Sequence, residues 1–191
     1  VTSTQMRVIA DLADRYNFGE IRSTHHQNLV FSDIALGDLY DLWQALAEYN
    51  LARPNIGTLT DIIACPGFDY CALANASTLN IVDQINAHFE EVDYVHDLGD
   101  LRLNISGCMN ACAHHHVGDI GILGVDKKGE YWYQISLGGS SKQDAKLGQI
   151  LGRSVAMDAV ASTLDDILQV YLAERQPEEL FADTVARIGL E

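Results

Sequence analysis

Two segments, CPGFDYC at residues 65–71 and SGCMNAC at residues 106–112, decide how the rest of the chain is interpreted. Together they contain every cysteine of the chain, as the pair Cys65 and Cys71 and the pair Cys108 and Cys112. Proline or glycine stands beside each pair, which is typical of tight turns. We therefore expect the two pairs to converge on one object that needs four soft ligands.

The spacing within each pair bears on the kind of site. An iron–sulfur cluster is held by four cysteine thiolates. Structural zinc sites usually separate the two cysteines of a knuckle by two to four residues, whereas five residues lie between Cys65 and Cys71 and three between Cys108 and Cys112. Disulfides need an oxidising compartment, and the N-terminus does not resemble a signal peptide. The spacing favours a cluster, with zinc, disulfides and buried free thiols as open alternatives.

Composition limits the class of protein. With 191 residues and 48% hydrophobic content, the chain is long enough for one domain, or two small ones, with a buried core. The formal net charge is −15, with only 12 Lys and Arg residues, and this argues against nucleic acid as a partner because phosphates are bound through clustered basic side chains. No apolar run approaches the roughly 20 residues that span a bilayer. We expect neither nucleic acid nor membrane as a partner.

Hydrophobic periodicity predicts an α+β fold. Helices are expected at residues 4–16, 38–49, 72–91, 154–175 and 178–188, and strands at 20–24, 28–34, 101–105, 119–125 and 130–139. Ser3 or Thr4 is expected to cap the first helix. The inward face of the second helix is predicted to contain Leu39, Leu42, Trp43, Leu46 and Ala47.

A helix beginning directly after Cys71 would present unpaired N–H groups to a thiolate. The breaker cluster at residues 53–57 predicts a division into domains 1–56 and 57–191.

The stretches CPGFDYCALA and SGCMNACAHHHVGDIGILG resemble the cluster-binding signature of the sirohaem-dependent sulfite and nitrite reductases. RYNFGEIRSTHHQNLVF resembles the ferredoxin-like half-repeat of that family, and FADTVARIGLE resembles its C-terminal ending, so the resemblance covers nearly the whole chain. It implies an incomplete second half-repeat in residues 1–56, followed by an α+β domain that binds a [4Fe–4S] cluster and sirohaem in residues 57–191.

The resemblance also implies roles for individual residues. Cys65, Cys71, Cys108 and Cys112 correspond to the cluster ligands, and Cys112 to the ligand that also binds the sirohaem iron. His115 matches a histidine of the motif, for which packing or hydrogen bonding is expected rather than ligation.

Four residues of the half-repeat, Arg22, Thr24, Gln27 and Asn28, are expected to contact sirohaem. A planar guanidinium suits the carboxylates of that cofactor. The competing interpretation of these residues is a polar hairpin turn.

The activity implied is six-electron reduction of sulfite to sulfide, or of nitrite to ammonia, in the cytoplasm, with electrons from a flavoprotein or a ferredoxin. The resemblance implies a longer protein in which the basic residues that bind the oxyanion substrate belong mainly to an N-terminal half, and we expect this half to be missing from the present chain. We therefore assign no catalytic residue and expect this chain alone to be inactive. The alternative function is a non-catalytic electron-transfer or metal-binding module without haem, and a zinc-stabilised structural domain is the third.

Overall fold

A computed structural model describes residues 1–143 and 145–190. The chain divides into two compact units, Val1–Pro54 and Asn55–Glu191. The predicted boundary after residue 56 lies two residues beyond this division. Within the described residues, no helix combines the length and the apolar character needed to cross a membrane.

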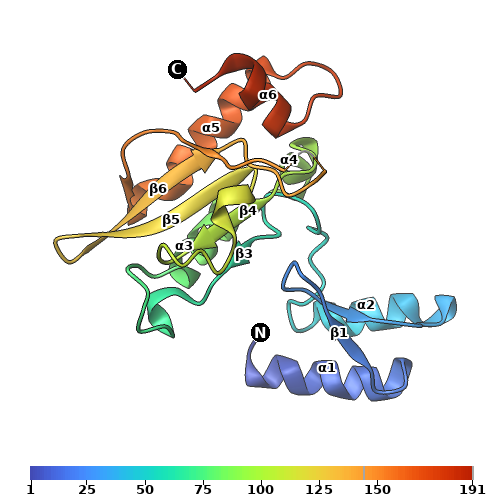
Figure 1. Cartoon of the computed structure of the whole chain (residues 1–191). Coiled ribbons are helices and arrows are strands. Elements are labelled where there is room, and N and C mark those ends of the chain that lie inside the picture. Colours follow the sequence, from blue (N-terminus) through green and yellow to red (C-terminus); the bar gives the residue numbers. More distant parts are fainter. Residues whose placement is uncertain (144, 191) are drawn as a thin grey trace. The chain divides into compact units, whose positions relative to one another are not determined.

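Unit 1 consists of two helices connected by a β-hairpin (Figure 1). Its elements in chain order are α1 (Ser3–Tyr16), β1 (Ile21–Ser23), β2 (Leu29–Phe31), the short 3-10 helix η1 (Leu36–Asp38) and α2 (Leu39–Ala47). The two strands are antiparallel, with Arg22 opposite Val30. This order of helix, strand, strand and helix confirms the prediction for this part of the chain.

The cap of α1 differs from the prediction. Thr2, rather than Ser3 or Thr4, caps the helix, because its hydroxyl accepts the backbone N–H of Gln5 at 3.2 Å and Gln5 Oε1 accepts the Thr2 N–H at 2.8 Å. Two N–H groups that the helix leaves unpaired are thereby satisfied in a reciprocal capping box.

The inward face of α2 is narrower than predicted. Leu42 is buried, whereas Trp43 is 51% exposed and Leu39 and Ala47 are also exposed. The helical spacing of apolar residues identifies the apolar face of a helix, but it does not show how much of that face neighbouring elements cover. In unit 1 the elements that can cover this face are α1, the short helix η1 and a two-stranded sheet.

Unit 2 is built on a six-stranded mixed sheet. Across the sheet the order is β3 (Ile63–Ala64), β4 (Leu103–Ser106), β5 (Ile120–Lys127), β6 (Glu130–Leu137) and β7 (Gln149–Ile150), and β8 (Val155–Ala156) also pairs with β6. The first three strands are parallel, and β5 and β6 form an antiparallel hairpin. The hairpin confirms the strands predicted at 119–125 and 130–139.

The helices and the sheet of unit 2 share one apolar core. The helices are α3 (Leu79–His88), α4 (Val92–Asp97), α5 (Val160–Glu174) and α6 (Phe181–Ile188), and the short 3-10 helices are η2 (Gly67–Asp69), η3 (His115–Val117) and η4 (Met157–Ala159). α3 and α5 pack on each other and cover one face of the sheet (Figure 1). Leu103 and Ile105 of β4 belong to this core. Because side chains alternate along a strand, Asn104 and Ser106 face the opposite side.

Two predicted helix starts are wrong by six residues or more. The helix predicted from residue 72 begins at Leu79, and residues 72–78 form turns instead. Their backbone groups bind the two cysteine-containing segments, as described below, and Leu73 is 73% exposed. The helix predicted from residue 154 begins at Val160, because β8 and η4 precede it. In both places tertiary hydrogen bonds override a helical pattern of apolar residues.

The last helix is held by one carboxylate. Glu179 makes a bidentate ion pair with Arg187, with N···O distances of 2.8 and 2.7 Å, and accepts the Thr184 hydroxyl at 3.0 Å and the Gln176 N–H at 2.9 Å. The Arg187 guanidinium, followed by the Gln176 N–H, lowers the pKa of Glu179 to about 2. Since this pKa is below the ordinary 4.5, the carboxylate stabilises the fold above pH 4.5, and the contribution is lost as the pH falls toward 2.

We expect Glu179→Gln to destabilise unit 2 in a pH-dependent way. The difference in free energy of unfolding between the parent and the variant should be largest at neutral pH and should shrink as the pH falls below 4.5. Denaturant unfolding at a series of pH values measures it. Glu178→Gln, which removes the same charge from an exposed neighbour, is the control. An equal difference at every pH would contradict the role of the ionised carboxylate.

Candidate metal centre

The parallel strands β3 and β4 bring the two cysteine pairs to the same edge of the sheet. Ile63 is in register with Asn104, and Ala64 with Ile105. Cys65 follows β3 directly, and Cys108 follows β4 after one glycine. Because parallel strands end at the same edge, the first cysteine of each pair emerges from the same end of the sheet.

Cys65 is fixed by backbone groups of the neighbouring strand. Its N–H donates to the Ile105 carbonyl at 3.1 Å, which continues the pairing of β3 with β4. The Gly107 N–H donates to Cys65 Sγ at an N···S distance of 3.1 Å. Hydrogen bonds to cluster sulfurs are one of the factors that set a reduction potential. The segment that delivers the second pair therefore already contacts a sulfur of the first.

A tight turn at Gly67 connects Cys65 to Cys71. The Cys71 N–H donates to the Gly67 carbonyl at 2.9 Å. Gly67 has φ +62°, and a Cβ at this position would lie 2.6 Å from the Thr78 backbone nitrogen. Both the left-handed backbone and the close approach require glycine.

The turn that carries Cys108 and Cys112 contains two left-handed residues. Ala111 has φ 53° and His114 has φ 54°, so one lies just before Cys112 and the other two residues after it. The Ala111 N–H donates to the Cys108 carbonyl at 3.2 Å, and the His114 N–H to the Ala111 carbonyl at 2.8 Å. Left-handed backbone in alanine is strained and persists only where the surrounding structure enforces it.

Residues 75–78 connect the two cysteine-containing segments. The N–H groups of Asn75 and Ala76 both donate to the Gly107 carbonyl, at 2.8 and 3.1 Å. In the other direction, the Ala76 carbonyl accepts the Phe68 N–H at 3.0 Å. The apolar spacing of the sequence placed these residues in the helix predicted at 72–91. Thr78 could have indicated that the helix begins later, because threonine favours helix N-termini and Thr78 lies directly before α3.

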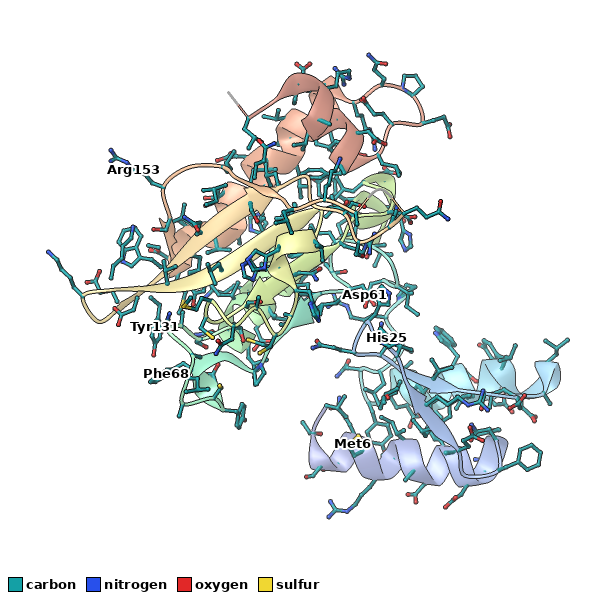
Figure 2. All side chains as sticks on the ribbon, in the orientation of Figure 1. Met6, His25, Asp61, Phe68, Tyr131 and Arg153 are labelled. Carbon is teal, nitrogen blue, oxygen red and sulfur yellow. The ribbon has the colours of Figure 1, made fainter. Side chains whose placement is uncertain are left out.

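The four thiols differ in exposure. Cys108 is buried, Cys65 and Cys71 are half-buried, and Cys112 is exposed, and all four are free thiols. Apolar side chains around them are also exposed, namely Phe68, Tyr70, Leu73 and Met109. The Phe68 and Tyr131 rings lie 6.0 Å apart between centroids, and Figure 2 shows them on neighbouring segments. Exposed apolar groups beside exposed sulfur form a surface suited to a large apolar ligand.

His115 is buried against the polar face of the sheet. Its ring lies 3.9 Å from that of His116, and its Nδ1 has no hydrogen-bond partner within the described part of the protein. Burial, followed by the neighbouring His116, lowers its pKa to about 4, so the imidazole is neutral at neutral pH. Asn104 fixes the segment that precedes His115, because the Asn104 Nδ2 donates to the Ala113 carbonyl at 2.8 Å.

The predicted sirohaem contacts lie on the hairpin of unit 1. Arg22 is in β1 and makes ion pairs with Glu20 at 2.6 Å and Asp33 at 3.9 Å. The Thr24 hydroxyl accepts the N–H groups of His26 and Asn28 inside the turn, at 3.2 and 3.1 Å. These contacts fit the hairpin-turn interpretation, and a role toward sirohaem stays a prediction.

Across residues 1–143 and 145–190, no group of three or more His, Cys, Asp or Glu side chains is gathered closely enough to hold one ion. A cluster takes one thiolate on each iron, so its four ligands stand apart around its body.

Comparison with known families divides the chain in two. Residues 57–191 match the family described as "Nitrite and sulphite reductase 4Fe-4S domain", and residues 1–49 match "Nitrite/Sulfite reductase ferredoxin-like half domain".

Individual relatives are sulfite reductases. The NADPH sulfite reductase hemoprotein beta-component of Methylorubrum extorquens is 28% identical over 173 residues, which cover 90% of this chain and 28% of the relative. The ferredoxin sulfite reductase of Mycobacterium tuberculosis is 30% identical over 197 residues, covering 98% of this chain and 35% of the relative. The solved structure of the M. tuberculosis NirA protein has a TM-score of 0.84 and 28% identity, covering the whole chain and 36% of that protein. The chain thus spans about a third of the length of these relatives.

Proposed function

The chain belongs to the nitrite and sulfite reductase family, and on that premise we propose that it forms the cluster-binding and sirohaem-binding part of a reductase for sulfite or nitrite. The family implies a [4Fe–4S] cluster and sirohaem as cofactors. When bound, they supply the electrons and the metal site for six-electron reduction of a small oxyanion. The observation that carries the proposal is the convergence of Cys65 and Cys108 on one sheet edge, where the Gly107 N–H contacts Cys65 Sγ.

The residues present fit these cofactors. Four free thiols are soft ligands of the kind that clusters use, and all four follow or lie within turns of the same unit. Cys65, Cys71, Cys108 and Cys112 are the proposed cluster ligands. Gly67 adopts its left-handed backbone without strain, whereas the strain at left-handed Ala111 is offset by the hydrogen bonds of the turn around it.

Cys112 is the proposed ligand shared with sirohaem. It is the exposed member of the four, whereas Cys108 in the same turn is buried. A sulfur that bridges two cofactors must be open to a second one, and exposure of Cys112 meets this requirement. Exposed Met109 in the same turn, together with exposed Phe68 and Tyr70 in the turn of the first cysteine pair, supplies apolar surface for a macrocycle.

Contacts to the sirohaem carboxylates are proposed for Arg22, Thr24, Gln27 and Asn28. Arg22 is exposed and forms ion pairs with the carboxylates of Glu20 and Asp33. A sirohaem carboxylate could replace one of these and would accept the same charge-assisted hydrogen bonds.

Electrons are proposed to come from a flavoprotein or a ferredoxin, since the relatives' names include NADPH and ferredoxin. The cytoplasm is the proposed location. The absence of turnover by this chain alone stays a prediction, which detectable six-electron reduction by the chain would contradict.

Loading the chain with cofactors tests the proposal. Anaerobic reconstitution with iron and sulfide should give iron and labile sulfide in the four-to-four ratio of a [4Fe–4S] cluster. Subsequent addition of sirohaem should produce its absorption bands in the protein fraction after gel filtration. Uptake of zinc with no cluster would overturn the proposal, and a cluster with no haem would favour the electron-transfer module instead.

A further inference from the structure

We propose that Ser77 and Thr78 form a clamp that positions Cys65 and thereby tunes the reduction potential of the cluster, an inference that rests on the proposed function. The Thr78 hydroxyl donates to the Cys65 carbonyl, and the Ser77 hydroxyl donates to Asp69 Oδ2 at 2.5 Å. Both acceptors belong to the loop that carries the first cysteine pair. Two adjacent side chains therefore hold the start and the middle of that loop.

The clamp is itself anchored to the core. Tyr133 of β6 is completely buried, and its hydroxyl donates to the Ser77 carbonyl at 2.6 Å. Burial raises the pKa of Tyr133 above its ordinary value, so the hydroxyl retains the proton that it donates. Ser77 and Thr78 are also buried, at 5% and 0% exposure. A buried anchor of this kind transmits the rigid position of the sheet to the loop.

The Thr78 hydroxyl bonds to the backbone of Cys65 and does not cap α3. Thr78 is the residue before α3, where a threonine side chain commonly accepts a backbone N–H, yet it makes no capping bond. Instead it satisfies the Cys65 carbonyl. The Thr78 hydroxyl therefore bonds to the first cysteine in place of a helix N–H. It stabilises the cysteine-containing loop and not the start of α3.

The clamp affects the reduction potential of the cluster through the hydrogen bond between the Gly107 N–H and Cys65 Sγ. Fixing the Cys65 backbone sets the position of Cys65 Sγ, which accepts the Gly107 N–H at 3.1 Å. An N–H directed at a thiolate stabilises negative charge, and the reduced cluster carries more of it, so this bond raises the reduction potential. Without the clamp the bond should lengthen, and the potential should become more negative.

Thr78→Val tests the inference, because valine keeps the branched shape and removes the hydroxyl. We expect the reconstituted variant to shift the one-electron reduction equilibrium up to tenfold toward the oxidised state, which corresponds to about 59 mV. Loss of the cluster to an iron chelator should be about tenfold faster, as for other residues that orient metal ligands. Potentiometric titration monitored by electron paramagnetic resonance measures the first, and absorbance decay measures the second.

Matched variants separate this role from general stability. Thr78→Ser keeps the hydroxyl and should restore the parent potential. Thr163 lies in α5, which contains no cysteine, and its hydroxyl donates to the Ala159 carbonyl at 2.7 Å. Thr163→Val removes this hydroxyl and should leave the reduction potential unchanged. If Thr78→Val does not fold, Ser77→Ala leaves Thr78 intact and should shift the potential in the same direction.

The outcomes distinguish the two proposals. If the parent chain binds no cluster, the proposed function fails. If the parent binds a cluster but Thr78→Val has the same reduction potential and resonance spectrum as the parent, the clamp is wrong, even if the variant is less stable. Where Thr78→Val does not fold, the same result for Ser77→Ala has the same meaning.

Discussion

Cys108→Ser should abolish cluster binding by the reconstituted chain. Cys108 is the buried member of the four thiols, directly after the glycine whose N–H contacts Cys65 Sγ. Serine preserves the size of the side chain, but its hydroxyl is a harder ligand that does not replace a thiolate on iron. Changes that only orient a ligand cost 10–100-fold in metal affinity, so removal of the ligand itself should exceed that range.

Iron and labile sulfide analysis, with the absorption spectrum, measures this loss. Cys65→Ser, Cys71→Ser and Cys112→Ser should behave alike if all four thiols are ligands. Met109→Leu is the control, since Met109 lies in the same turn, is 81% exposed and contributes no proposed ligand. A Cys108→Ser protein that retains the parent content of iron and sulfide would remove this cysteine from the site.

Gly121→Ala should strongly destabilise unit 2. A Cβ on Gly121 would lie 2.0 Å from the His115 carbonyl oxygen and 2.6 Å from Ser136 Oγ. The serine can rotate, but the carbonyl is backbone and belongs to η3, which packs on β4 and β5. Overpacking of this kind costs about 3 kcal/mol or more in free energy of unfolding. It should also displace the segment that follows Cys112.

Denaturant unfolding followed by Trp132 fluorescence measures this destabilisation. Trp43 belongs to unit 1, so Trp43→Phe in both proteins confines the signal to unit 2. Gly152→Ala is the matched control, because a Cβ there has nothing within 4 Å. Its effect should stay within about 1 kcal/mol and be stabilising, since alanine restricts the unfolded chain. Equal midpoints for Gly121→Ala and its parent would show that the His115 segment moves without cost.

Local patterns predicted much of the fold. The hairpin of β5 and β6 is visible because alternating residues on both sides of a short turn favour paired strands. The helix, strand, strand, helix order of unit 1 follows from period and from Gly19, whose φ is +73° at the end of α1. These elements depend on interactions between residues close in sequence.

Other elements were not predictable in this way. β3 and β7 have two residues each, too short for any period to appear. The apolar spacing after Cys71 favours a helix, but hydrogen bonds from Asn75 and Ala76 to Gly107, more than thirty residues away, decide against it. A local preference of a few tenths of a kcal/mol per residue is smaller than the cost of leaving such buried groups unpaired.

The chemistry of the candidate centre can be read from the amino-acid sequence alone: four thiolate donors in two pairs, with glycine or proline beside each, and flanks that resemble one family. How the two pairs meet is visible only in the folded chain. The parallel register of β3 and β4 brings Gly107 to Cys65 Sγ, and the loop before α3 brings Thr78 to the Cys65 carbonyl. The physical reason is that ligand type is a property of single side chains. Convergence depends on hydrogen bonds between segments that no local pattern relates.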